Sequence, residues 1–263
     1  MLASRGFASL ALAYFKYEDL PTSFRKLDIE YFEEAVNYLL TVPNVIPDGC
    51  GVIGTCLGGV FAIALGVYVE KVRAIITINT AAIASGIQIT YQGKIVIQGS
   101  KMTSEHMTFD DKFRVTPRKE LWQSMMVPEH PNILPIDQIP ADKSVLIIAG
   151  DDDSMLGHLS AQMFETKYKQ SGKSNIRKII YKGAGHMIEP PYGPLIEHAY
   201  QVDSNPAGKD PSKYVMYWGG KSNYMCTAQE NSWAIIQDFI RSNISNKWSF
   251  NNLSPDNKIS SKL

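Results

Sequence analysis

The sequence lacks the features that mark several large classes of protein. No apolar run approaches the roughly 18 residues that a membrane-spanning helix needs, so no membrane span is expected. Basic and acidic residues number 26 each, and this balance gives no sign of a nucleic-acid partner. Internal repeats and low-complexity tracts are also missing. What remains is the composition of an ordinary globular protein, with 44% hydrophobic and 20% charged residues.

Cysteine is scarce, and the spacing of the cysteines is not that of a metal-binding site. The three cysteines are Cys50, Cys56 and Cys226, an odd number with no C-x-x-C pair. This pattern argues against a disulfide framework and against a zinc site, and it suits a reducing compartment. We therefore expect no bound metal, and the role of each cysteine has to be sought in its local sequence.

The first 80 residues alternate between strand-like and helix-like patterns. The apolar run 7–15 predicts a buried parallel strand, with a short signal peptide as the alternative. A helix over 29–40, with Asp28 as its N-cap, is followed by a strand at 51–53 and a helix from 57 to about 69. A further strand is expected at 72–79. This order predicts an α/β protein with a mostly parallel sheet and right-handed crossovers.

Residues 81–143 break the alternation, and we interpret them as a long irregular insertion that forms a lid or cap. The alternation then resumes. We expect a strand at 144–150, a helix at 156–170, a strand at 176–181, a long loop at 187–226 and a last helix at 228–242. The predicted organisation is one catalytic domain over residues 1–245 and a polar, flexible tail over 246–263.

The segment Gly54-Thr55-Cys56-Leu57-Gly58 lies between a predicted strand and an apolar helix. It has the pattern of a nucleophile elbow, with cysteine in place of the commoner serine. We expect the flanking glycines to be required because a Cβ atom in so tight a turn would clash. The start of the helix would favour a thiolate, and the Leu57 N–H would donate to an oxyanion. The alternative is that Cys56 is a small core residue.

Two further residues follow later strands at the same predicted edge of the sheet. Asp153 ends the turn after 144–150, and His186 follows 176–181. Because functional groups gather at the carboxyl ends of parallel strands, we expect Cys56, Asp153 and His186 to meet. The order nucleophile, acid, histidine is that of α/β-hydrolases. His186 would accept the thiol proton and Asp153 would orient the imidazole, with Asp152 as the alternative acid.

Several longer stretches resemble one family. They are residues 7–20, 28–40, 51–59, 182–195 and 218–220. Together they resemble the catalytic domain of the acyl-CoA thioesterases and bile acid-CoA:amino acid N-acyltransferases. The resemblance implies an α/β-hydrolase fold, with a catalytic triad that falls on Cys56, Asp153 and His186. It also implies an enzyme of acyl-CoA and fatty acid metabolism that acts on fatty or bile acyl-CoA. Water, glycine or taurine would be the acceptor, and no cofactor is expected because the CoA thioester is itself the substrate.

The chain departs from the family pattern at its start. Met1 falls within what resembles the end of the first hydrolase helix, and we therefore expect that N-terminal strands and the glycine-rich loop with the second oxyanion donor are missing. The loss of one donor is expected to slow acyl transfer by about 100-fold. Residues 7–15 would then pair directly with the elbow strand. Two alternatives stay open, a non-catalytic truncated family member and a cysteine carboxylesterase similar to dienelactone hydrolases.

The last three residues, Ser261, Lys262 and Leu263, form the peroxisomal address at a free C-terminus. They predict a peroxisomal location, with the cytosol as the alternative, and the peroxisomal import receptor as a partner.

Overall fold

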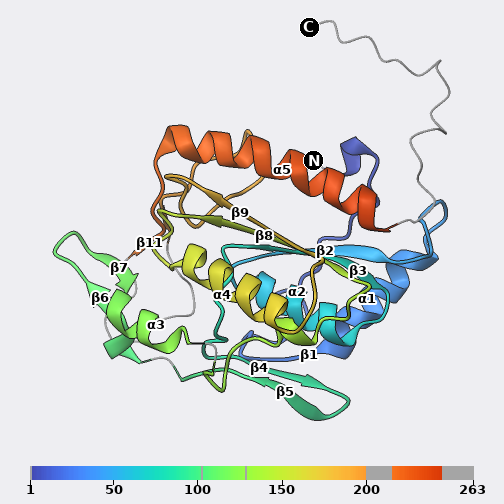
Figure 1. Ribbon diagram of the computed structural model, residues 1–263, viewed down its shortest axis with the longest axis horizontal. Coiled ribbons are helices and arrows are strands. Elements are labelled where there is room, and N and C mark those ends of the chain that lie inside the picture. The colour runs from blue at the N-terminus through green and yellow to red at the C-terminus, as the bar shows by residue number, and fades with distance from the viewer. Residues whose placement is uncertain (1, 102, 128, 200–214, 245–263) are drawn as a thin grey trace, which may run out of the picture.

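A computed structural model describes residues 2–101, 103–127, 129–199 and 215–244. Its centre is a parallel sheet of four strands in the order β2 (Cys50–Thr55), β3 (Val72–Ile78), β8 (Ser144–Gly150) and β9 (Ile176–Tyr181). Each of the four strands coincides with one of the apolar runs that the sequence predicted to be a strand. This arrangement confirms the predicted α/β class, with helices on both faces of the sheet (Figure 1).

Helices cover the sheet because its strands are apolar on both faces. One core cluster combines residues of β3 and β8 with α1 (Ile29–Thr41), α2 (Leu57–Tyr68) and α4 (Gly157–Gln170). The alternate strand residues, among them Ile76 and Leu146, form a second cluster with α5 (Ser222–Ile244). In Figure 1, α5 lies above the sheet and α2 and α4 lie below it. Burial on both faces explains why the strands show continuous apolar runs instead of alternation.

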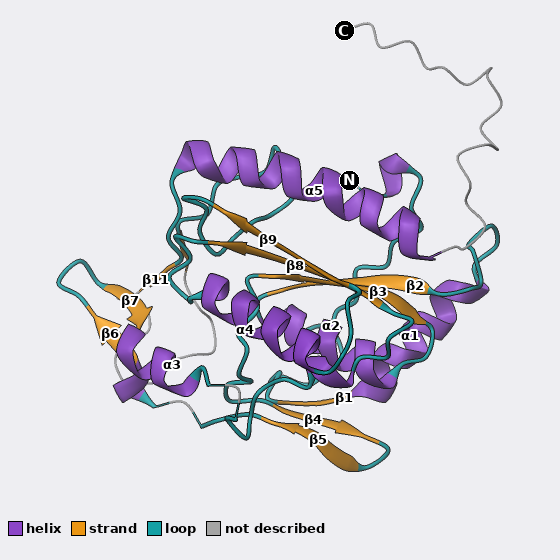
Figure 2. Cartoon of the chain, in the orientation of Figure 1, coloured by secondary structure: helices purple, strands orange, loops and turns teal. Residues whose placement is uncertain are grey.

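The region 81–143 is more regular than the sequence suggested. It contains β4 (Gln88–Tyr91), β5 (Lys94–Gln98), β6 (Met107–Phe109), β7 (Arg114–Pro117) and α3 (Lys119–Met125). Two of these strands also pair with partners outside the region, β4 with β1 and β7 with β11. The order β1-β4-β5 includes β1 (Lys26–Asp28), and the order β10-β11-β7-β6 includes β10 (His198–Ala199) and β11 (Val215–Tyr217). Figure 2 shows both small sheets apart from the central one. Whether the region acts as a lid stays a prediction.

The remaining regular elements of the described ranges are the short 3-10 helices η1 (Ala3–Arg5), η2 (Ser104–His106) and η3 (Ile136–Gln138). The helices and central strands predicted after residue 28 are all present. The last helix begins at Ser222, several residues before its predicted start, and the predicted loop 187–226 contains β10 and β11. In the described ranges no helix is long and apolar enough to cross a membrane.

The predicted strand over 7–15 is wrong. The segment has no strand assignment and does not pair with β2, which has β3 as its single strand partner among the described residues. Leu10 is 45% exposed, whereas Leu12 and Tyr14 pack against the core beside α2. The Tyr31 side chain of α1 holds the segment, because its Oη donates a hydrogen bond to the backbone carbonyl of Ala13 at 2.6 Å. The apolar residues of this segment therefore pack against helices, and the segment does not pair with a strand.

Asp28 occupies the N-cap position of α1, but its side chain makes no capping hydrogen bond. Its carboxylate instead accepts a hydrogen bond from the Thr90 hydroxyl of the neighbouring strand β4. The predicted boundary of the helix was correct, and the predicted side-chain cap was wrong, because the pairing of β1 with β4 brings a competing donor to the carboxylate.

Candidate active site

Cys56 lies in a strained turn between β2 and α2. Its φ of 55° and ψ of −119° are rare for a residue with a side chain, and it is the N-cap residue of α2. The turn is fixed on both sides, since the Cys56 N–H donates to the Ile78 carbonyl at 2.9 Å and the Gly59 N–H donates to the Cys56 carbonyl at 3.1 Å. The sulfur is thus attached to the start of a helix, where unpaired N–H groups favour an anion.

The two glycines that flank the elbow are not equivalent. A Cβ atom on Gly54 would lie 2.1 Å from the Gly58 carbonyl oxygen, so a side chain cannot fit there. A Cβ atom on Gly58 would meet nothing within 4 Å. The prediction of a clash was therefore right for Gly54 and wrong for Gly58, because of the two only Gly54 faces the backbone of the first turn of α2.

Asp153 and His186 are in direct contact. The Asp153 Oδ1 atom lies 2.9 Å from His186 Nδ1, and the two residues are 3% and 1% exposed. Backbone N–H groups also hold the carboxylate, from Met155 to Oδ1 at 2.8 Å and from Gly157 to Oδ2 at 3.0 Å. Asp152 is exposed, and its carboxylate accepts a hydrogen bond from the backbone N–H of Gly220 at 3.3 Å. Of the two aspartates, the structure brings Asp153 to the imidazole.

The stretch Trp218-Gly219-Gly220 joins the aspartate and histidine loops, a role that the sequence pattern alone did not reveal. The Trp218 ring stacks on the His186 imidazole, with centroids 4.9 Å apart and an interplanar angle of 17°. The Trp218 carbonyl accepts the His186 N–H at 3.0 Å. Gly219 has φ of 74°, and a Cβ atom there would lie 2.0 Å from the Asp152 carbonyl oxygen. This close approach requires glycine.

Asn79 is a second positioning residue that the sequence reasoning missed. It is 1% exposed and follows β3. Its Nδ2 donates to the carbonyls of Gly185 and His186 at 2.9 and 2.7 Å, and its Oδ1 accepts the Gly150 N–H at 2.8 Å. It therefore ties the histidine loop to the end of β8. The sequence signal that could have found it is a single amide side chain directly after the strand-like run.

The three predicted side chains also share one electrostatic environment. Burial by itself would raise the pKa of the Cys56 thiol, but the positive charge of His186 and the Leu57 backbone N–H outweigh it and lower that pKa. Burial would lower the pKa of His186, but the charges of Asp153 and Cys56 raise it well above its usual range. His186 Nε2 is buried. A direct side-chain interaction between the imidazole and the Cys56 thiol contributes to both pKa shifts.

The other histidines are not among the residues that contact Cys56, Asp153 or His186 in the described part of the chain. His106 forms a capping box with Thr103, His158 lies in α4 and His198 lies in β10. No group of three or more His, Cys, Asp or Glu side chains in the described part of the chain could hold a metal ion. Ser261, Lys262 and Leu263 lie outside the described residues, as does the predicted tail from residue 246.

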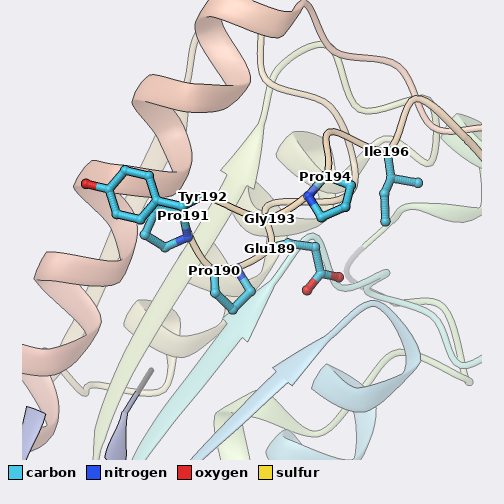
Figure 3. A pocket seen from close by; sticks show the side chains of 7 residues that line it. All are labelled: Glu189, Pro190, Pro191, Tyr192, Gly193, Pro194 and Ile196. Carbon is cyan, nitrogen blue, oxygen red and sulfur yellow. The ribbon is translucent and has the colours of Figure 1, made fainter. Parts of the chain in front are cut away.

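A cavity of about 430 Å³ lies a few residues beyond His186 along the chain. It is lined by the loop Glu189, Pro190, Pro191, Tyr192, Gly193, Pro194 and Ile196 (Figure 3). Cys56 is not among the residues that line this cavity.

Comparison with known proteins explains this combination of fold and site. The family model described as BAAT / Acyl-CoA thioester hydrolase C terminal matches residues 27–246. The chain belongs to this family. The α/β-hydrolase fold class expected from the resemblance is consistent with the parallel sheet and its helices.

Relatives in the BAAT / acyl-CoA thioester hydrolase family bear two kinds of name. Acyl-coenzyme A amino acid N-acyltransferase 1 of Mus musculus is 37% identical over 93% of this chain and 55% of its own length. Bile acid-CoA:amino acid N-acyltransferase of Homo sapiens is 34% identical, also over 93% and 55%. Acyl-coenzyme A thioesterase 2, mitochondrial, of Mus musculus is 32% identical over 94% and 52%. The chain thus spans about half the length of these relatives.

One solved structure with a similar course of the chain is MGS-M1, an alpha/beta hydrolase enzyme from a deep-sea metagenome library. It has 11% sequence identity, covers 81% of this chain and 64% of its own, and has a TM-score of 0.42. The assignment to the family rests on the sequence relatives and not on this likeness.

Proposed function

We propose that this protein transfers acyl groups from fatty or bile acyl-CoA through an acyl-cysteine intermediate on Cys56. Membership of the BAAT / acyl-CoA thioester hydrolase family supports the acyl-CoA substrate. The observation that carries the mechanism is the buried contact of 2.9 Å between His186 and Asp153 beside the elbow cysteine. In this proposal Cys56 is the nucleophile, His186 the general base and acid, and Asp153 the group that orients and charges the imidazole.

The first half-reaction starts from a thiolate and an imidazolium. The Cys56 sulfur attacks the thioester carbon, a carbon–sulfur bond forms, and the carbonyl electron pair moves to oxygen. The Leu57 N–H stabilises the resulting oxyanion. When the oxyanion collapses, the bond to the CoA sulfur breaks and His186 returns its proton to that sulfur. The products are an acyl-cysteine thioester and free CoA.

The second half-reaction depends on the acceptor. Because one thioester has been exchanged for another, the acyl group on Cys56 stays activated. His186 can take a proton from water or from the amine of glycine or taurine while the acceptor attacks the acyl carbon. The bond to the Cys56 sulfur then breaks and the thiolate returns, with free acid as the product from water and an amide as the product from the amine. Cysteine as nucleophile favours capture by an amine. Relatives named N-acyltransferase and relatives named thioesterase both match the chain, so the acceptor has to be measured.

The decisive experiment is intact mass spectrometry after incubation with a long-chain or a bile acyl-CoA. We expect one acyl adduct on Cys56 in the wild type and in Cys50→Ala, and none in Cys56→Ala. An adduct that persists in Cys56→Ala would contradict the proposal. Addition of glycine or taurine then separates the two acceptors, because product analysis finds either free acid or amide.

A non-catalytic family member is the alternative from another class. It predicts binding of acyl-CoA without any adduct, even after long incubation, whereas the enzyme predicts an adduct within one turnover. The same mass measurement, combined with a binding measurement by calorimetry, distinguishes them.

We also propose a peroxisomal location, in keeping with acyl-CoA metabolism. The support is the C-terminal tripeptide Ser261-Lys262-Leu263. A fluorescent protein fused to the N-terminus of the chain should enter peroxisomes, and removal of the tripeptide should leave it in the cytosol. Unchanged peroxisomal import without the tripeptide would contradict this proposal.

A further inference from the structure

Trp218 contacts the His186 imidazole face to face. The indole and the imidazole are nearly parallel, with an interplanar angle of 17° and ring centroids 4.9 Å apart. The edge of the imidazole is engaged elsewhere, since Nδ1 lies 2.9 Å from the Asp153 carboxylate. His186 and Trp218 are 1% and 8% exposed, so water has little access to the contact. A buried aromatic ring therefore covers one face of the side chain that carries the proton.

The backbone around Trp218 fixes the position of this contact. Its carbonyl oxygen accepts hydrogen bonds from the N–H of His186 at 3.0 Å and from the N–H of Ser154 at 3.4 Å. The next residue, Gly219, forms an antiparallel bridge with Asp153. The segment that carries the indole is thus tied to both sides of the contact between Asp153 and His186.

The indole is also held by the small sheet that includes β6 and β7. Trp218 directly follows β11, which pairs with β7. Its ring belongs to a buried apolar cluster with one residue from each of β6, β7 and β11, namely Met107, Val115 and Met216. Met187, which directly follows His186, packs against the same cluster. These contacts keep the indole in place against the imidazole.

The face of an indole attracts a cation, because the π electrons place negative charge above and below the ring. This attraction acts on the imidazolium form of His186 and hardly on the neutral imidazole, and it is strongest where water is excluded. In the described part of the chain, the charges that act on His186 are those of Asp153 and Cys56. The indole adds a further attraction without placing another charged group in the buried site.

We propose that Trp218 is a positioning residue that holds the His186 ring against Asp153 and stabilises its imidazolium form. This stabilisation belongs to the fold and does not require substrate. Its consequence for catalysis rests on the proposed function, in which a protonated His186 accompanies the Cys56 thiolate and later returns its proton to the sulfur of CoA. Trp218 acts through the imidazole and not on the acyl group.

The first test measures the protonation of His186 without the acyl-CoA reaction. His186 is titrated by NMR of isotope-labelled histidine in Cys56→Ala, where no thiol can exchange a proton with it. Its resonance is assigned by its absence in His186→Gln. Addition of Trp218→Leu should reduce the proton affinity of His186 about tenfold, which lowers the midpoint by about one pH unit. Trp218→Phe keeps a weaker aromatic face and should lower the midpoint less.

Trp233→Leu on the same background is the matched control. Trp233 is 9% exposed, and its Nε1 donates to the Ile188 carbonyl of the histidine loop at 3.4 Å, whereas the indole stacked on His186 is that of Trp218. A lower midpoint in Trp218→Leu with an unchanged midpoint in Trp233→Leu supports the proposal. An unchanged or higher midpoint in Trp218→Leu overturns it, because the indole would then only shield the imidazole from water. An equal fall in the control also overturns it.

A second measurement decides the proposal if far-UV circular dichroism shows that Trp218→Leu does not fold. Cys56→Ala is prepared with fluorinated tryptophan, which withdraws electrons from the ring face and nearly keeps the shape of the indole. The His186 midpoint should fall relative to the unlabelled protein. With Trp218→Phe added, labelled and unlabelled proteins should share one midpoint. An unchanged midpoint in the first pair, or an equal shift in the second, overturns the proposal.

The last test measures single-turnover acylation by acyl-CoA in Trp218→Leu and Trp233→Leu with Cys56 present. We expect the rate constant at saturation to fall about threefold or more in Trp218→Leu alone, with the half-saturating concentration of acyl-CoA unchanged. An unchanged rate constant would overturn the role in acyl transfer. If the wild type forms no acyl-enzyme while the NMR midpoints shift as expected, the proposed function fails and the role of Trp218 at the imidazolium stands.

Discussion

The two ends of strand β2 carry the same residue in opposite environments. Cys50 begins the strand and is 6% exposed, and burial raises the pKa of its thiol to about 11. Cys56 follows the strand, and the charge of His186 lowers its pKa in spite of burial. Six positions along the chain therefore separate a thiol that stays protonated from one that favours the thiolate.

Helix α2 accounts for part of this difference. Its start lies at Cys56, where the N–H groups form the positive end of the helix dipole. Near its other end, the buried Lys143 Nζ donates to the carbonyls of Gly66 and Val69 at 2.9 and 2.8 Å. The charge of Lys143 lowers the pKa of Cys50, but by less than burial raises it. A histidine paired with a carboxylate exists at only one end of the strand, and that pair decides which cysteine can react.

The largest effect is expected from removal of the reactive thiol. Cys56→Ala should reduce acyl transfer by a factor on the order of 10⁴ or more, because no acyl-enzyme can form. Cys50→Ala should keep the rate and reduce the free energy of unfolding by about 1 kcal/mol through lost packing. Steady-state kinetics and urea unfolding of both variants measure this. Equal loss of activity in the two variants would remove the distinction between the ends of β2.

The second effect concerns the carboxylate that charges the imidazole. Asp153→Asn should reduce acyl transfer by about 10³-fold, since the amide cannot hold the imidazolium or its tautomer. Asp152→Asn is the matched control, because this neighbouring carboxylate is exposed and does not contact His186. Kinetics of the two variants compare them directly, and similar rates would assign the acid to neither position.

The third effect tests the geometry of the elbow. Gly54→Ala places a Cβ atom 2.1 Å from the Gly58 carbonyl oxygen and should lower the free energy of unfolding by about 3 kcal/mol or more. Gly58→Ala meets open space and should stay within about 1 kcal/mol of the wild type. Chemical denaturation measures both. A loss of similar size in the two variants would be inconsistent with a turn closed on one side only.

The smallest effect is the dependence of the resting site on pH. A lowered pKa for Cys56 and a raised pKa for His186 mean that both groups stay charged between these two values. The stability that the Cys56 thiolate contributes is lost as pH falls through its lowered pKa. The stability from the His186 imidazolium is lost as pH rises through its raised pKa. The free energy of unfolding of wild type minus that of His186→Gln should therefore be largest in this interval, and a flat difference would exclude the ion pair.

The order of helices and strands could be predicted because a buried strand can be recognised from the apolar residues of its own short stretch of sequence. The strands at 72–79 and 144–150 are buried on both faces, and their composition is that of such strands. The same signal misled at 7–15, where an apolar run packs against α1 and α2 without any ladder. A run of apolar residues reports burial, and the presence of a pairing partner depends on what lies beside it in space.

The sequence by itself determined which residues compete for the site, since Cys56, Asp153 and His186 each follow a strand and fit the order of the family. Tertiary structure alone decided that Asp153, and not Asp152, reaches the imidazole, and that Gly54, and not Gly58, must lack a side chain. It also brought Asn79 and Trp218 to the same place. Their contacts join segments far apart in the chain, and no local pattern carries information about such distances.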